Sequence, residues 1–188
     1  MEHIEIEFKM LLDEKLFHQI LKDYKEQITD SYQQTNYYLF HPELENRKYS
    51  LRIREKKGSY ELTLIRPAKE GLKELNLDIN QEIKEMIFNH QDISNEIFDL
   101  LKEEKIYIKD LQCGDYLTTI RHDILLLDGM LSLDENEYNH HHDYEIEFEV
   151  NDSKKGLETF KEIIKPYHLQ YTSNCPSKIK RLLQTKNQ

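Results

Sequence analysis

Three charged side chains at two-residue spacing near the start of the chain are the first residues whose types could do chemistry. Glu5, Glu7 and Lys9 alternate with apolar residues, so on a β-strand they share one face and the apolar side chains share the other. Carboxylates at this spacing can converge on a hard divalent cation such as Mg²⁺ or Mn²⁺. On a solvated sheet face such charges are ordinary, whereas on a buried face they are costly unless they hold something.

Later segments repeat the alternation, and their polar faces separate by charge. The segment "SLRIR" places Arg52 and Arg54 on one face, and guanidinium groups at this spacing match the geometry of phosphate oxygens. The segment "DYEIEFE" instead carries a ladder of carboxylates. The remaining charged positions of this pattern are Glu74, Arg121, Asp123, Asp134, Glu145, Glu147 and Glu149.

Two interpretations fit these strands. In the first, they are the solvated outer faces of a sheet that packs its other side on helices, as half-exposed antiparallel strands commonly do. In the second, the sheet closes into a barrel, and the charged faces line one lumen with an acidic and a basic side. Such a lumen would suit a metal-bound anion of high charge. The separation of paired arginines and carboxylate ladders onto different strands favours the second interpretation.

The elements that must position these residues are mostly short strands joined by hairpins. Turn signals at Lys57-Gly58 and Asp128-Gly129 predict two hairpins, and helical spacing of apolar residues predicts helices between and after them. About eight strands in this arrangement imply an α+β (mainly β) fold with an antiparallel sheet or barrel and helices packed outside. The strands are expected at 3–12, 35–41, in hairpins over 48–67 and 116–138, and at 72–79 and 143–150; the helices are expected at 13–27, 80–90, 92–105, 152–165 and 177–184.

Composition excludes several classes of protein. The net charge of −10 over 188 residues argues against general binding of nucleic acid or of an anionic membrane surface, which require a basic field. No run of 18 apolar residues predicts a membrane span, and the charged first strand leaves no room for a signal peptide. Cys113 and Cys175 form no CxxC motif and are expected to be free thiols in a reducing cytoplasm. We therefore expect a cytoplasmic protein.

These motifs together resemble those of the CYTH superfamily, also called triphosphate tunnel metalloenzymes, and most of all its short members from Firmicutes. The most specific match is the ExExK signature, present here as "EIEFK" at residues 5–9. The resemblance covers nearly the whole chain and runs in a consistent order. The further matches are "LRIR", "LTL" with a following proline, Glu74, Thr119-Ile120-Arg121, "LSLD" ending at Asp134, "DYEIEFE", and Ser177, Lys178 and Arg181.

The resemblance implies a single CYTH-like domain over residues 1–188, built as an antiparallel eight-stranded tunnel that binds a triphosphate with Mg²⁺ or Mn²⁺. It implies catalytic roles for Glu5, Glu7 and Lys9. The metal ligands it implies are Glu5, Glu7, Asp134, Glu145, Glu147 and Glu149. The substrate-binding residues it implies are Lys9, Arg52, Arg54, Arg121, Lys178 and Arg181 against phosphate, with Glu74 as a tunnel-facing partner of the basic side.

By this resemblance we expect a metal-dependent triphosphatase, a phosphoric anhydride hydrolase. Inorganic triphosphate is the first expectation for its substrate, with thiamine triphosphate or a nucleoside triphosphate as alternatives. A class IV-type adenylate cyclase and a non-catalytic binder of polyphosphate or nucleotide also fit. The binder is favoured by one departure from the family pattern, because Ile65 replaces a lysine expected to face the tunnel. The expected partner is a small-molecule triphosphate, without nucleic acid or membrane, and the expected state is a monomer or homodimer.

The run of histidines at 140–142 suggests a metal site at first sight. Consecutive side chains on an extended segment point to alternate sides, so the three rings cannot easily converge on one ion. We expect this run to form the loop before the last long strand.

Overall fold

The computed structural model describes residues 2–185 of the chain. Its strands pair in the order β1-β5-β4-β3-β2-β6-β7-β8 and close into an eight-stranded antiparallel barrel, which confirms the fold expected from the sequence. The strands are β1 (Glu2–Leu12), β2 (Asp30–Phe40), β3 (Ser50–Lys56), β4 (Ser59–Pro67), β5 (Leu72–Ile79), β6 (Gln112–Leu126), β7 (Gly129–Tyr138) and β8 (His141–Val150).

The helices begin where the sequence supplies capping residues. Asp13 accepts a hydrogen bond from the backbone N–H of Leu16 at 2.8 Å, and Asp152 accepts one from that of Lys155 at 2.9 Å. None of the helices described is both long and apolar enough to cross a bilayer. The helices are α1 (Glu14–Asp23), α2 (Pro42–Asn46), α3 (Gln81–Phe88), α4 (Glu96–Glu103), α5 (Ser153–Ile164) and α6 (Lys178–Thr185), with short 3₁₀ turns η1 (Lys25–Gln27), η2 (Ile108–Asp110) and η3 (Lys165–Tyr167).

Contacts along the chain divide it into two compact units. Unit 1 consists of residues 2–4 and 34–116, and unit 2 consists of residues 5–33 and 117–185. The expectation of a single domain over the whole chain stays a prediction, and the two units are described separately.

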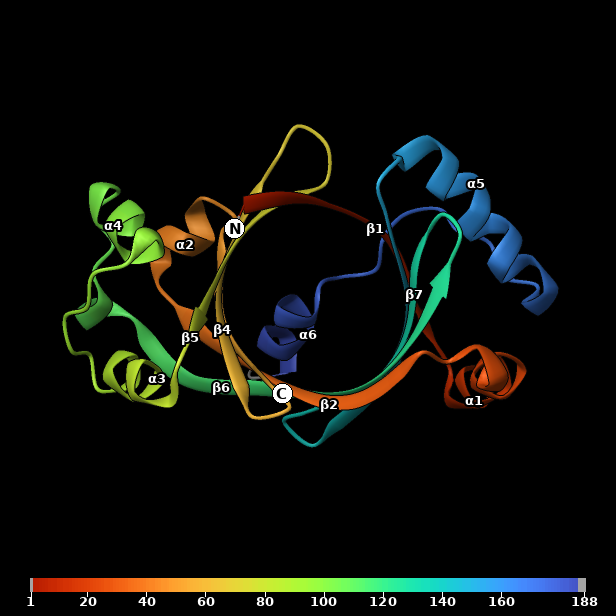
Figure 1. Ribbon diagram of the computed structural model, residues 1–188, viewed down its shortest axis with the longest axis horizontal. Coiled ribbons are helices and arrows are strands. Elements are labelled where there is room, and N and C mark those ends of the chain that lie inside the picture. Colours follow the sequence, from red (N-terminus) through yellow and green to blue (C-terminus); the bar gives the residue numbers. More distant parts are fainter. Residues whose placement is uncertain (1, 186–188) are drawn as a thin grey trace. The chain divides into compact units, whose positions relative to one another are not determined.

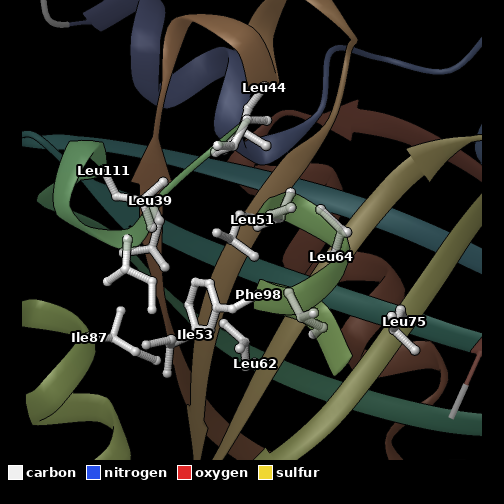
Figure 2. Packing of buried hydrophobic residues seen from close by; sticks show 14 residues of the cluster. Leu39, Leu44, Leu51, Ile53, Leu62, Leu64, Leu75, Ile87, Phe98 and Leu111 are labelled. Carbon is white, nitrogen blue, oxygen red and sulfur yellow. The ribbon is translucent and has the colours of Figure 1, made fainter. Parts of the chain in front are cut away.

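Unit 1 separates apolar from polar side chains by strand parity. On one face of β3, β4 and β5, Leu51, Leu62 and Leu75 pack against α3, α4 and the segment up to η2, forming a fully apolar core. Figure 2 shows Leu51 and Leu62 near Phe98 of α4, with Leu75 farther along the same apolar cluster. The strand register places Arg52 opposite Thr63, on the other face.

Unit 2 is built in the same way around β1, β6, β7 and β8. Phe148 of β8 and Leu133 of β7 pack against Phe17 of α1 and Phe160 of α5, all fully buried. We call the opposite face of these strands the polar face of unit 2. Helix α6 departs from the expectation that all helices pack on apolar faces, because its first turn contacts carboxylates of the polar face, whereas α1 and α5 cover the other side (Figure 1).

Several expected boundaries shift in the structure. Strand β2 begins at Asp30, five residues before the expected start, and β6 begins at Gln112 rather than 116. The histidine run was expected in a loop, and this is wrong for two of its members. Asn139 and His140 form the tight hairpin turn with positive φ angles of 46° and 64°, and His141 and His142 begin β8 as exposed strand residues.

Candidate functional site

Three buried carboxylates on the polar face of unit 2 form the centre of the candidate site. Asp134 lies on β7, and Glu145 and Glu147 lie on β8. The register pairs Asp134 with Glu145 and Ser132 with Glu147, so all three acids point to one side of the sheet. One oxygen from each carboxylate lies within 4.8 Å of the other two. These three acids were all expected from the sequence as metal ligands, and the structure brings them together.

A single ammonium group contacts all three acids. Nζ of Lys178, in the first turn of α6, lies 2.8 Å from Oδ2 of Asp134, 3.0 Å from Oε2 of Glu145 and 2.6 Å from Oε1 of Glu147. The Lys178 side chain is only 11% exposed. Three carboxylates that converge on one ammonium group can also converge on a divalent metal ion such as Mg²⁺.

Two guanidinium groups complete the cationic side of the cluster. Arg121 of β6 binds Asp134 through two parallel bonds, from Nε at 2.7 Å and from Nη2 at 2.6 Å, and it also contacts Glu147. Arg181 of α6 donates to Glu145 at 2.5 Å and to Asp143 at 2.9 Å. Three of the four basic residues of unit 2 that were expected to bind phosphate therefore lie against these carboxylates, and the fourth is Lys9.

Lys9 and Glu7 extend the cluster onto β1. Lys9 is buried, forms an ion pair with Glu7, and lies directly opposite Glu147 in the register of β1 with β8. Burial alone would favour a neutral amine, but Glu7 and Glu147 outweigh it and raise the pKa of Lys9 well above its ordinary value. The lysine of the ExExK signature is therefore a fixed positive charge.

Glu145 and Glu147 are neighbours whose pKa values move apart. Burial raises the pKa of Glu145, and the nearby charge of Glu147 adds to this effect although Lys178 opposes it. Burial would also raise the pKa of Glu147. The positive charges of Lys178, Arg121 and Lys9 outweigh burial and hold this pKa well below its usual range. Glu147 is thus the carboxylate that stays ionised. Of the two glutamates, Glu145 is the one that binds a proton more readily.

The donor set of this cluster fits a hard divalent cation. All three converging ligands are carboxylates, which Mg²⁺ and Mn²⁺ prefer, and no softer nitrogen or sulfur ligand belongs to the three-residue group found among the described residues. The same face also carries Lys9, Arg121, Lys178 and Arg181, which suit an anion. Carboxylates and cations that now neutralise one another could instead each bind one component of a metal–polyanion complex.

The sequence model of the CYTH domain family matches residues 3–181 of the chain. The chain belongs to the CYTH family. The match includes the "EIEFK" residues and ends at Arg181, so the family assignment covers every residue of the site just described.

Relatives of the CYTH family resemble the chain over nearly its full length. A protein of Bacillus subtilis (strain 168) with the name "Putative triphosphatase YjbK" is 30% identical over 172 residues, which cover 89% of this chain and 88% of the relative. The crystal structure of a protein from Bacillus halodurans, described as a "putative adenylate cyclase", is 31% identical with a TM-score of 0.87, covering 96% of this chain and 97% of that one.

A more distant structure, from Hippeastrum, is described as that of a "putative adenylyl cyclase" with "a dominant triphophatase activity". It is 22% identical to this chain with a TM-score of 0.75, and the alignment covers 96% of each chain. At this identity the likeness supports the fold alone.

Unit 1 contains a smaller group of polar residues that belong to the CYTH motifs. Arg52 lies 3.6 Å from the buried carboxylate of Glu74, and Nε of Arg54 donates to Oδ1 of Asn36 at 3.2 Å. Nε of Arg52 is buried and has no hydrogen-bond acceptor within residues 2–185. Roles of these three expected residues in substrate binding stay predictions.

Ile65, the departure from the CYTH pattern, lies on the polar face of unit 1. It stands opposite Ser50 on β3 and opposite Glu74 on β5, in a continuous ladder without a bulge. The neighbouring Arg66 points to the other side and forms an ion pair with Glu2 at 2.5 Å. Arg66 therefore does not take the place of the missing lysine.

Two further expected ligands are not among the three converging carboxylates. Glu5 is half-buried, and Glu149 is exposed and stands opposite Glu7. Their roles as metal ligands stay predictions.

Two site residues were missed from the sequence. Asp143 shares its strand parity with Glu145, which could have identified it, whereas Asn174 lies in an irregular segment and carries no periodic signal.

Proposed function

We propose that this CYTH protein hydrolyses a small triphosphate, with inorganic triphosphate as the first candidate, in a reaction that requires Mg²⁺ or Mn²⁺. The observation that carries this proposal is the contact of three converging carboxylates with buried basic side chains on one sheet face. A triphosphate bears several negative charges, and several fixed cations together with a metal are needed to neutralise it. The name of the Bacillus subtilis relative, which refers to triphosphatase activity, supports the same reaction class.

In this proposal the cation is held by Asp134, Glu145 and Glu147, and Glu7 lies on β1 as the ion-pair partner of Lys9. When bound, a divalent cation supplies Lewis-acid polarisation of phosphoryl oxygens. Glu147 provides a permanent negative charge for it, because the pKa of that carboxyl is held well below its ordinary value by Lys178, Arg121 and Lys9 against the effect of burial.

The basic side chains bind and orient the phosphates. Arg121 and Arg181 present planar guanidinium groups, which can bind two phosphate oxygens at once. Lys9 and Lys178 add point charges that remain protonated, because their carboxylate neighbours outweigh burial and raise both pKa values. Together these groups would stabilise charge on the transferred phosphoryl group.

A carboxylate near the cluster can orient the attacking water. Without a cation, burial raises the pKa of Glu145, whereas a cation held by the same carboxyl would lower it again. Glu145 would therefore orient the water by accepting a hydrogen bond from it. We assign Glu145 this role, in addition to metal binding.

The test is a panel of phosphate-release assays. The purified protein is given inorganic triphosphate, thiamine triphosphate or ATP, each with Mg²⁺, with Mn²⁺ or with a chelator, and cyclic AMP is measured in the ATP reactions. We expect metal-dependent release of phosphate from inorganic triphosphate. The variant Glu147→Gln should lose at least about 100-fold in kcat/KM, since it removes the fixed charge of the metal site. Glu158→Gln, an exposed change on α5, should stay within about twofold.

Two outcomes would replace the proposal. Cyclic AMP as the main product would indicate the cyclase alternative. Triphosphate binding without any turnover would indicate the binder, which Ile65 beside Glu74 favours because one family cation is missing there.

A further inference from the structure

The side chain of Asn174 is bonded to the backbone of the strand that carries the ExExK signature. Its Oδ1 accepts a hydrogen bond from the backbone N–H of Lys9 at 2.8 Å, and its Nδ2 donates to the backbone carbonyl of Glu7 at 3.0 Å. Groups two residues apart on a strand point to the same edge. Because the N–H of Lys9 donates to Asn174, Asn174 lies along the edge of β1 opposite to the edge that pairs with β8.

The orientation of the amide is fixed by its partners. The hydroxyl of Tyr171 also donates to Oδ1 of Asn174, at 3.0 Å, so the oxygen accepts two hydrogen bonds while the nitrogen donates one. A flipped amide would set its NH₂ group against the Lys9 N–H and its oxygen against the Glu7 carbonyl. Asn174 therefore imitates the peptide group of a neighbouring strand.

The next residue continues the attachment. The backbone N–H of Cys175 donates to the carbonyl of Lys9 at 3.2 Å, and its thiol lies 3.6 Å from Oε1 of Glu145. The segment from Asn174 to Cys175 thus makes three hydrogen bonds to the backbone of β1 although it belongs to no strand.

Helix α6 starts directly after this attachment. Lys178 follows Asn174 by four residues, and Arg181 donates from Nη1 to the carbonyl of Pro176 at 2.6 Å. The positions of both basic groups thus depend on the backbone between 174 and 177. Without its bonds to β1, this irregular backbone would sample other conformations, and the basic groups would be displaced from the carboxylates.

We propose that Asn174 is a positioning residue, which ties the helix of Lys178 and Arg181 to the strand of Glu7 and Lys9. Its amide holds the phosphate-binding side chains of α6 in place and touches no substrate itself. The kinetic consequence rests on the proposed triphosphatase function, whereas the structural consequence does not.

Three variants test the proposal at pH 8. Asn174→Ala removes the amide. Asn174→Asp keeps its shape and its acceptor but sets an oxygen against the Glu7 carbonyl. Ser173→Ala changes the exposed neighbour and is the matched control. Asn174→Ala loses both hydrogen bonds to β1, and Asn174→Asp loses one and sets two oxygens against each other, so each change shifts an equilibrium by about tenfold. We expect KM for inorganic triphosphate to rise about tenfold in both Asn174 variants with kcat within about threefold, and no change in Ser173→Ala.

A measurement that needs no turnover separates the two claims. Hydrogen–deuterium exchange of peptides covering 178–185 should become at least about fivefold faster in Asn174→Ala and in Asn174→Asp, while exchange over 153–164 of α5 stays as in the wild type. If the wild type hydrolyses no triphosphate, the proposed function fails and the exchange data still decide the role of Asn174.

Unchanged hydrogen–deuterium exchange of α6 in both Asn174 variants would overturn the proposal. Wild-type exchange and KM in Asn174→Asp would also overturn it, because the shape of the side chain and not its hydrogen bonds would then hold α6 in place. Because Asn174 is exposed, both variants should fold, and a melting temperature within a few degrees of the wild type verifies this. An increase of exchange in α5 as large as that in α6 would show general destabilisation and would also refute a positioning role.

Discussion

Lys178, on the last helix, donates a hydrogen bond of 2.6 Å to Glu147, on the last strand, and both side chains are almost completely buried. The same ammonium lies 2.8 Å from Asp134 and 3.0 Å from Glu145. One lysine therefore contacts all three acids that could hold a metal, and it shares their compensation with Arg121 and Arg181. Burying such acids without a cation is expensive, so helix α6 stabilises the acidic cluster and is held by it.

The first prediction is that Lys178→Met destabilises the protein and makes its stability depend on divalent cations. Loss of one partner from a buried ion pair costs about 3–5 kcal/mol, which lowers the melting temperature of a chain of this size by about 6–20 °C. Burial raises and Lys178 lowers the pKa values of Glu145 and Glu147, so without the lysine these carboxyls protonate more readily and the loss should be smaller at pH 6 than at pH 9. Thermal melts with and without Mn²⁺ measure it.

Added Mn²⁺ should raise the melting temperature of Lys178→Met by several degrees more than that of the wild type, because the ion can take over the charge of the missing ammonium. Lys180→Met, at an exposed position on the same helix, is the matched control and should melt like the wild type. The absence of any response to Mn²⁺ in both Lys178→Met and the wild type would contradict metal binding by these acids.

The second prediction is that Glu7→Ala abolishes metal-dependent turnover and leaves the fold intact. Glu7 pairs with Lys9, but Lys9 still faces Glu147 across the register, so its charge does not become uncompensated. The melting temperature should change by less than about 5 °C. Turnover and circular-dichroism melts on one preparation test this, with the exposed Glu26→Ala as control. Wild-type turnover in Glu7→Ala would remove this residue from the active site.

Strand parity made much of the site predictable from the sequence. Alternation of apolar and charged residues identified the side of β8 on which Glu145 and Glu147 point, and hairpin signals identified the strands around them. The attachment of α6 could not be predicted, because Asn174 acts from an irregular segment through backbone groups that every sequence has. Which cation pairs with which acid was likewise hidden, since it depends on contacts between distant segments.

The third prediction concerns the thiol of Cys175. Burial and the adjacent carboxylate of Glu145 raise its pKa to about 12. A thiol becomes reactive as the thiolate, and at pH 8 an ordinary cysteine has a far larger thiolate fraction. In the variant Cys113→Ser, we expect Cys175 to be alkylated by iodoacetamide at least about 100-fold more slowly than free glutathione at pH 8, with a rate that rises about tenfold per pH unit up to pH 11.

Glu145→Gln in the same background removes the negative charge beside the thiol and should speed alkylation of Cys175. Mass spectrometry of the modified peptide gives the rate. Alkylation of Cys175 at the rate of glutathione would show that the segment holding Asn174 opens readily, against its attachment to β1.

The last prediction is that Ile65→Lys strengthens the binding of inorganic triphosphate. The register sets position 65 directly opposite the buried carboxylate of Glu74, which would offset the desolvation of a new ammonium group. A charge-assisted contact to phosphate contributes about 1.5–3 kcal/mol. Glu74 takes part of this, so we expect a dissociation constant about tenfold lower by calorimetry, in the same buffer and salt. Ile65→Met, similar in size but uncharged, should bind like the wild type. Equal binding by all three proteins would mean that Glu74 neutralises the lysine, and Glu74→Gln combined with Ile65→Lys would then restore the gain.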